Sequence, residues 1–175
     1  MPVSETEFRA ALGRFASGVT VVTARDARGN PKGITVSSFA SLSLVPPLVL
    51  IAIGKEASAH EALSGTDRFA VNVLSEAQEA ISRKFAMPAG RVDQFEGVPT
   101  RRGAGDVPLL EDTLATIECR IVERYPGGDH TIFVGAVDTA AARDGLPLLY
   151  FTGQYGRLAH DPQPSPNPKL RSKNQ

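Results

Sequence analysis

Hydroxyl side chains are concentrated in one short segment, from Gly33 to Leu48, which contains two adjacent prolines. The hydroxyl residues of this segment are Thr35, Ser37, Ser38, Ser41 and Ser43. Such hydroxyls, like free backbone N–H groups at a strand end, donate hydrogen bonds without requiring a counter-charge. They suit a phosphate or a polyol, although solvent-facing residues on an edge strand explain the pattern equally well.

Metal and nucleophilic chemistry find little support in the sequence. The histidines His60, His130 and His160 are far apart, and Cys119 is the single cysteine, whereas a zinc site needs about four ligands, or three and a water. Cys119 shares its alternation with neighbouring isoleucines at 117 and 121, which favours a buried core thiol over a catalytic nucleophile. We therefore expect no metal site.

The usual motifs of hydrolases and nucleotidases are also missing. The sequence has no Gly-x-Ser-x-Gly, no His-Glu-x-x-His and no phosphate loop ending in Gly-Lys-Ser/Thr. Gly103 and Gly105 begin like a dinucleotide-binding fingerprint, but Pro108 stands at the third glycine position. A nicotinamide nucleotide would have to bind this chain without a Rossmann fold.

Composition limits the partners and the location. Nineteen basic residues cancel nineteen acidic ones, which argues against bulk nucleic-acid binding. The longest apolar runs, such as Leu48 to Ile53, are far shorter than the roughly 20 residues that span a bilayer. Glu5 and Glu7 stand where a signal peptide has basic residues, so we expect no secretion signal. One cysteine permits no internal disulfide, as in a reducing compartment, so we expect a cytoplasmic protein. Because the apolar runs are short, we expect no membrane span.

Periodicity and turn residues predict mostly strands. The predicted strands span residues 19–24, 33–39, 48–53, 69–74, 115–121, 131–137 and 148–151, and the predicted helices span about 5–16, 58–63 and 75–85. Capping-box spacing marks the helix starts at Ser4, Ser58 and Ser75. The segment 87–109 is rich in proline, glycine and charge and is expected to be a surface loop. This pattern favours a mainly β, antiparallel barrel with peripheral α-helices.

Seven short motifs follow one another in a recognisable order. They are Phe15-Ala-Ser-Gly-Val-Thr-Val-Val-Thr23, Thr35-Val-Ser-Ser-Phe-Ala-Ser-Leu-Ser-Leu44, Pro46-Pro47-Leu48, Phe69-Ala-Val-Asn-Val-Leu74, Phe85-Ala86, Gly128-Asp-His130 and Pro147-Leu-Leu-Tyr150. With these motifs the chain, from about Phe8 to Leu158, resembles the flavin reductase-like family, the short-chain NAD(P)H:flavin oxidoreductases of two-component monooxygenases. The resemblance implies a Greek-key, FMN-binding split β-barrel at 1–160, and we expect a disordered tail at 161–175.

The same resemblance implies where a flavin binds. The residues expected to line it are Thr35, Ser37, Ser38, Ile51, Ala52 and Ile53. The helix start at Ser58 would offer N–H groups and a favourable dipole to the phosphate, unless it is a simple helix cap. Lys84 is expected to neutralise the phosphate and Phe85 to form a wall of the site. As an alternative, Arg83 and Lys84 lie on a solvated helix face and bind nothing. The alternative for Phe85 is a place in the hydrophobic core.

His130 is the expected catalytic residue. The resemblance implies that it lies beside the nicotinamide and orients it over the flavin, although a histidine at a hairpin turn is more often exposed and idle. Tyr155 is a second expected nicotinamide contact, with packing or a dimer contact as its alternative.

The expected activity is hydride transfer from NADH or NADPH to FMN or FAD, in a homodimer that supplies reduced flavin to a separate monooxygenase. Hydride passes directly between stacked rings, so no strong general base is required. Three alternatives stay open: an FMN-binding electron carrier, an oxidase of a phosphorylated pyridine like the pyridoxamine-phosphate oxidases, and a structural barrel without a ligand. The choices between FMN and FAD and between NADH and NADPH stay open as well.

Overall fold

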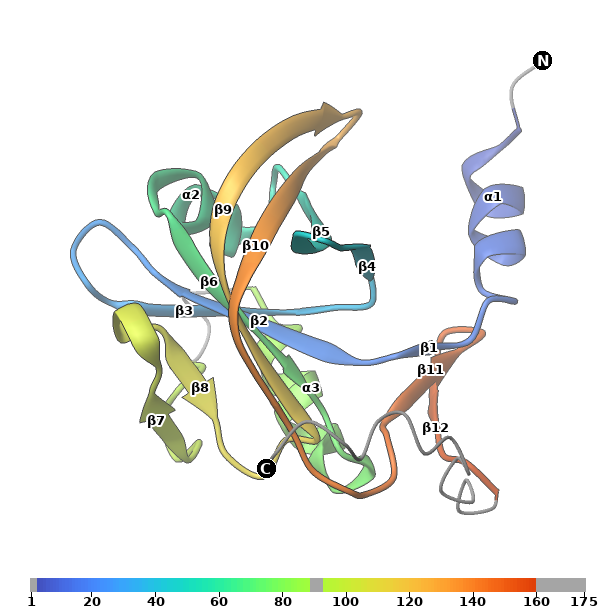
Figure 1. Cartoon of the computed structure of the whole chain (residues 1–175). Helices are drawn as coiled ribbons and strands as arrows, with labels where there is room; N and C mark the ends of the chain where they lie inside the picture. Colours follow the sequence, from blue (N-terminus) through green and yellow to red (C-terminus); the bar gives the residue numbers. More distant parts are fainter. Residues whose placement is uncertain (1–2, 89–92, 160–175) are drawn as a thin grey trace.

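The computed structural model describes residues 3–88 and 93–159, which form antiparallel sheets with α-helices at their periphery (Figure 1). The helices are α1 (Glu5–Leu12), α2 (Ser58–Gly65) and α3 (Glu79–Phe85), with the 3₁₀ turns η1 (Glu76–Gln78) and η2 (Ala104–Asp106). The strands are β1 (Ser17–Gly18), β2 (Thr20–Arg25), β3 (Pro31–Val36), β4 (Phe39–Leu44), β5 (Pro47–Gly54), β6 (Arg68–Val73), β7 (Thr100–Arg102), β8 (Pro108–Leu110), β9 (Ala115–Gly127), β10 (His130–Ala142), β11 (Leu149–Phe151) and β12 (Gln154–Gly156). The expected tail at 161–175 lies outside the described residues, so the domain boundary stays a prediction.

Seven strands form one antiparallel sheet in the order β3-β2-β6-β9-β10-β5-β4, which confirms the mainly β, antiparallel prediction. β3 and β4 are its two edge strands, so the strand pairings of the described residues do not themselves close a barrel. The chain nevertheless passes directly from one edge to the other through Ser37 and Ser38. The backbone N–H of Ala52 in β5 donates to the Ser38 carbonyl at 3.2 Å. This junction brings the end of β3 to β5.

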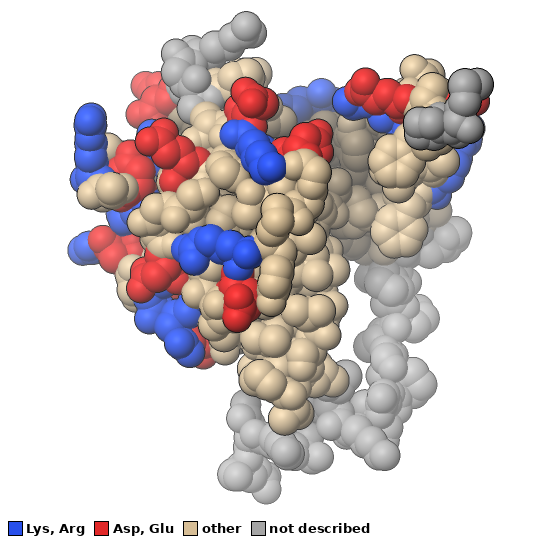
Figure 2. All heavy atoms as spheres, turned by 90° about the horizontal axis from the view of Figure 1, so that it is seen from above, with Lys and Arg blue, Asp and Glu red and all other residues tan. Residues whose placement is uncertain are grey.

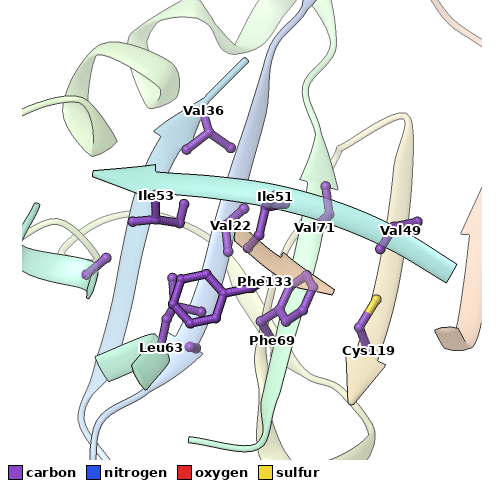
Figure 3. Packing of buried hydrophobic residues seen from close by; sticks show 12 residues of the cluster. Val22, Val36, Val49, Ile51, Ile53, Leu63, Phe69, Val71, Cys119 and Phe133 are labelled. Atoms are coloured by element: carbon purple, nitrogen blue, oxygen red, sulfur yellow. The ribbon is translucent and has the colours of Figure 1, made fainter. Parts of the chain in front are cut away.

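The main hydrophobic core lies on the inner face of this sheet. In β5 the alternate residues Val49, Ile51 and Ile53 are buried. Figure 3 shows Ile51 and Ile53 pointing toward the rings of Phe69 and Phe133, which are fully buried as well. Burial of each such side chain stabilises the fold by roughly 1.5–3 kcal/mol. The core therefore fixes the orientation of β5, and with it the residues on its outer face.

A second cluster packs α3 against the sheet. Phe85 is 1% exposed and lies with Leu148 and other apolar residues in this cluster. The rings of Phe85 and Phe95 meet edge to face, with centroids 5.0 Å apart. A Cβ at Gly33 would lie 2.5 Å from Phe85 Cε1, so the missing side chain lets α3 approach β3. The C-terminal half of α3 is thereby held beside the end of β3.

The structure corrects several predicted elements. The helix expected over 5–16 ends at Leu12, because Gly13 is its C-cap. The strand expected over 33–39 is divided into β3 and β4 by the turn at Ser37–Ser38, and β4 pairs with β5 instead of β2. The segment 87–109, expected to be a loop, contains the hairpin β7-β8. Short β12 was not expected and pairs with β11.

Two of the three predicted helix caps are confirmed. Both Ser4 and Ser75 form reciprocal capping boxes, with Glu7 and Gln78 respectively. The prediction for Ser58 is wrong, because Ala57 is the N-cap of α2 and makes no side-chain cap bond. The spacing of residue types therefore identifies a helix start to within one residue, while the local backbone decides which residue caps it.

Charges of both signs are interspersed over one side of the face in Figure 2, beside a broad stretch without charged side chains. This mixing agrees with the zero net charge of the chain. No helix within residues 3–88 and 93–159 has the length and apolar character needed to cross a membrane. The same residues contain no group of three or more His, Cys, Asp or Glu arranged to hold a metal ion.

Cys119 is buried in the core, as its alternation predicts. Burial raises the pKa of its thiol to about 12, with smaller contributions from Asp138 and Glu118. At pH 8 the native thiol then carries roughly a thousandfold less thiolate than an ordinary cysteine. We expect a thiol reagent to modify Cys119 at least a hundredfold more slowly in buffer than in denaturant, measured by absorbance at pH 8. Equal rates would contradict the burial.

The raised thiol pKa also sets a direction for stability. The folded state disfavours the thiolate, so the contribution of Cys119 to stability is constant below the pKa of the unfolded thiol, about 8.5. It falls as the pH rises above that value toward 12. A Cys119→Ala variant lacks this titration.

Candidate functional site

A cavity of about 200 Å³ opens where β3 ends beside α3. Thr35 and Ser37 line it from β3 and the turn that follows, and Tyr155 lines it from β12. The Ser37 side chain is exposed. Thr35 and Ser37, from one predicted motif, therefore share a cavity with Tyr155, from a distant part of the sequence.

Ser82 in α3 connects the two walls of this cavity. The Thr35 hydroxyl donates to the Ser82 carbonyl at 2.7 Å, and Ser82 Oγ lies 2.8 Å from the Tyr155 hydroxyl. Ser82 is fully buried, whereas its two partners, Thr35 and Tyr155, are partly exposed at the cavity. Sequence reasoning missed this residue, although its spacing three residues before Phe85 places it on the same face of the helix.

The β3-to-β4 junction extends the site to β5. Ser38 Oγ donates to the Ala52 carbonyl at 2.7 Å, in addition to the backbone bond between the same two residues. Ala52 is half-buried and lies on the opposite face of β5 from Ile51 and Ile53, which are both 0% exposed. The alternation of the strand turns the side chains of Ile51 and Ile53 into the core, so the predicted flavin contact at 51–53 is left to backbone groups and stays a prediction.

His130 lies on the same outer face as Ala52. It is opposite Gly54 across the β5-β10 ladder, two residues or about 7 Å along the strand from Ala52. Its side chain is 46% exposed, and Nδ1 lies 2.8 Å from Asp129 Oδ1. This hydrogen bond, followed by the charge of the histidine, lowers the pKa of Asp129. The imidazole is thus oriented by a neighbouring carboxylate while its ring remains open to a ligand.

The other predicted flavin contacts lie elsewhere. Phe85 is in the core, so its burial contradicts a role as a wall of the flavin site. Lys84 Nζ donates to the Glu96 carbonyl. Ser58 lines a different depression of about 440 Å³, together with Lys32 and Arg28. The sequence analysis did not predict that Arg28, in the β2-β3 turn, and Lys32, in β3, lie beside Ser58.

Arg83, and not Lys84, faces the cleft. Its guanidinium carbon lies 4.7 Å from the centroid of the Tyr155 ring. Arg83 and Tyr155 both line a cavity of about 560 Å³. This cavity shares the lining residues Ala86, Tyr150 and Tyr155 with the cavity of about 200 Å³. The two cavities therefore lie next to each other, with Tyr155 in the wall of both.

The residues present at this cleft fit a flavin. An exposed hydroxyl at Ser37 and the hydroxyl of Thr35 supply polar contacts, and the Tyr155 ring supplies an aromatic surface. Arg83 supplies a cation at the wider end. Hydroxyl groups, an aromatic face and a cation are the surfaces that a flavin ring, its ribityl chain and its phosphate require. The Thr35 hydroxyl serves there as an acceptor, because its proton is donated to the Ser82 carbonyl.

Comparison with known proteins agrees with this chemistry. A relative described as "FMN reductase (NADH) SmoA", from Agrobacterium fabrum, is 46% identical over 87% of this chain and 85% of its own. The reductase component of 4-hydroxyphenylacetate 3-monooxygenase from Thermus thermophilus is 43% identical, over 86% of this chain and 95% of its own.

A solved structure is equally similar. The NADH:FAD oxidoreductase SgcE6 of Streptomyces globisporus, in complex with NAD and FAD fragments, superposes with a TM-score of 0.84. It is 42% identical and covers 90% of this chain and 94% of its own. The family model described as "Flavin reductase like domain" matches residues 12–159. The chain therefore belongs to the flavin reductase-like family.

Proposed function

We propose that this chain is a flavin reductase that transfers hydride from NADH or NADPH to FMN or FAD and supplies the reduced flavin to a separate monooxygenase in the cytoplasm. The observation that carries the proposal is the cavity shared by Thr35, Ser37 and Tyr155, in a chain of this family. The relative from Thermus thermophilus, named as the reductase component of a monooxygenase, supports the partner class.

The chain's own residues bind and orient in this reaction. A bound flavin supplies the hydride acceptor. Ser37 offers a hydroxyl at the β3-to-β4 junction, where the Ser38 hydroxyl donates to the Ala52 carbonyl. The Tyr155 hydroxyl is held by Ser82. Asp129 accepts from His130 Nδ1–H, which in a neutral imidazole leaves Nε2 as an acceptor for the nicotinamide carboxamide.

The decisive experiment is a flavin titration followed by turnover. The purified protein is titrated with FMN and FAD, and oxidation of NADH and NADPH is then followed at 340 nm with each flavin. Multiple turnovers support the reductase. Stoichiometric flavin binding without turnover would favour the electron carrier, and a colourless protein without flavin affinity would favour the structural barrel.

Substitution of His130 tests the nicotinamide contact. In His130→Ala, loss of one hydrogen bond to the substrate should raise KM for NADH roughly tenfold, because 1.4 kcal/mol corresponds to a factor of ten. The dissociation constant for flavin should stay within twofold, measured by quenching of flavin fluorescence. A variant that loses both affinities equally would exclude this role.

A homodimer is part of the proposal. Phe15, just after α1, is 80% exposed, and Leu44 and Val45 at the end of β4 are 85% and 93% exposed. Figure 1 shows α1 standing apart from the sheet, and none of its residues is buried. Large exposed apolar side chains of this kind mark association surfaces. The cavity at Thr35 also has a volume below the usual 300 Å³ of a small-molecule site, as expected if part of its wall is missing from a single chain.

We expect light scattering after gel filtration to give twice the chain mass. Replacing both Leu44 and Val45 by glutamate should weaken dimerisation at least tenfold, since charge would be buried at the interface. The control is Val122→Glu, at another exposed apolar position, which should leave the dimer intact. A wild-type monomer at micromolar concentration would contradict the proposal.

A further inference from the structure

A separate cavity lies between the β7-β8 hairpin and the paired ends of β9 and β10. It measures about 270 Å³ and is lined by residues 101, 110–116 and 141–143. It shares no lining residue with either cavity at Tyr155, and Figure 1 shows β7 and β8 well apart from β11 and β12. The cavity is therefore distinct from the proposed flavin site.

Two arginines line this cavity without an ion pair. Within the described part of the chain, neither Arg101 nor Arg143 pairs with a carboxylate, whereas the neighbouring Arg102 pairs with Asp106. A guanidinium binds the oxygens of phosphates and carboxylates through parallel N–H donors. Both side chains are exposed, so an oxyanion can reach them.

Backbone carbonyls hold Arg143 in place. Its Nε donates to the Thr113 carbonyl at 2.7 Å, and its Nη2 donates to the Asp112 carbonyl. Nη1 has no hydrogen-bond partner among the residues that the structure describes, so it keeps two N–H donors for a ligand. The carbonyls fix the guanidinium but do not pair its charge.

A buried hydroxyl adds a further donor. Thr116 is 7% exposed and lines the same cavity. Its Oγ1 accepts from Arg101 Nη2 at 3.5 Å, which is a long and weak hydrogen bond. The hydroxyl proton itself has no acceptor among the described residues. A ligand oxygen would satisfy this buried donor, and leaving such a group unsatisfied costs free energy.

Two carboxylates restrict which oxyanion can bind. Glu111 and Asp112 line the cavity as well, and neither side chain pairs with a cation in the described part of the chain. They repel a fully ionised anion, but a carboxylate accepts a hydrogen bond from an anion that keeps a proton. Hydrogen phosphate keeps one proton, whereas sulfate keeps none. The lining therefore favours hydrogen phosphate over sulfate.

We propose that this cavity binds a small oxyanion that carries its own hydrogen-bond donor, of which hydrogen phosphate is the simplest example. Arg101, Arg143 and Thr116 donate to the oxygens of the ligand, and Glu111 and Asp112 supply the acceptor for its proton. The proposal does not depend on the proposed function, because the two sites have no lining residue in common.

Calorimetric titration with inorganic phosphate at pH 8 and constant ionic strength tests this site. The wild type should bind phosphate with a dissociation constant on the order of 1 mM, and sulfate at least tenfold more weakly. Arg101→Gln should weaken phosphate binding at least tenfold. The fold should tolerate this change, because Arg101 makes one long side-chain hydrogen bond. Arg14→Gln, at an exposed position outside the cavity, is the matched control and should bind phosphate as the wild type does.

A double variant, Glu111→Gln with Asp112→Asn, tests the selectivity. Amides of the same shape remove the repulsion, so the affinities for sulfate and phosphate should come within about threefold of each other. Absence of saturable phosphate binding to the wild type would overturn the proposal. Equal phosphate binding by Arg101→Gln would place the anion elsewhere and overturn it too. The same holds for equal affinities of the wild type for both anions, or an unchanged preference in the double variant.

Discussion

Replacing Ser37 by phenylalanine should weaken flavin binding by at least tenfold and remove most of the turnover. Ser37 is exposed and lines the cavity of about 200 Å³ between Thr35 and Tyr155. A phenyl ring there fills space that a flavin would need, and the exposed position leaves the core unchanged. The measurement is the dissociation constant for FMN and FAD by fluorescence quenching, with NADH oxidation at 340 nm as the second readout.

The control for this substitution is Ser37→Ala, which keeps the space and removes only the hydroxyl. A net hydrogen bond of about 0.5–1.5 kcal/mol corresponds to a twofold to roughly tenfold loss of affinity. The phenylalanine variant must lose clearly more than the alanine variant. Equal affinity in Ser37→Phe and the wild type would show that the flavin binds outside this cavity.

Phe133→Ala is expected to lower the free energy of unfolding by about 3–5 kcal/mol, the usual cost of deleting a buried phenylalanine ring. Phe133 is fully buried and lies among the residues of the main core, together with Phe69 and Ile51 (Figure 3). The cost combines the lost transfer of the ring from water with the cavity that remains. Urea unfolding followed by circular dichroism gives the value.

Phe133→Leu separates cavity formation from a specific role of the ring, because it fills most of the space and should cost much less. Flavin affinity of the leucine variant should match the wild type, since Phe133 faces away from the outer surface of β5 and β10. A loss below 1 kcal/mol in Phe133→Ala would contradict the packing of this core.

The sequence predicted much of the fold because its signals are local. The alternation at 117–121 placed Cys119 in the core, and the reciprocal boxes at Ser4 and Ser75 marked two helix starts, each within four residues of chain. The division of one expected strand at Ser37–Ser38 was not predicted. It depends on pairing with β5, and a pairing partner distant in sequence leaves no periodic trace in the strand itself.

Part of the site was also predicted, because the motifs that indicate it are local in the sequence. The resemblance predicted Thr35 and Ser37 as flavin contacts and Tyr155 as a nicotinamide contact, and the structure brings all three to one cavity. Adjacent Arg83 and Lys84 carry the same charge, so composition does not distinguish them. The phase of α3 against β3 and β12 does: it sends Arg83 over Tyr155 and Lys84 toward Glu96.

By itself, the sequence determined the strand-rich class, the antiparallel hairpins and the family, because residue types at short spacing carry that information. Only the tertiary structure decided that Phe85 belongs to the core and that Ser82 links Thr35 to Tyr155. Ser82 and Tyr155 are separated by 73 positions in the chain. Their contact exists only after packing of α3 against the sheet has brought the two segments together, because a hydrogen bond needs its partners within about 3 Å.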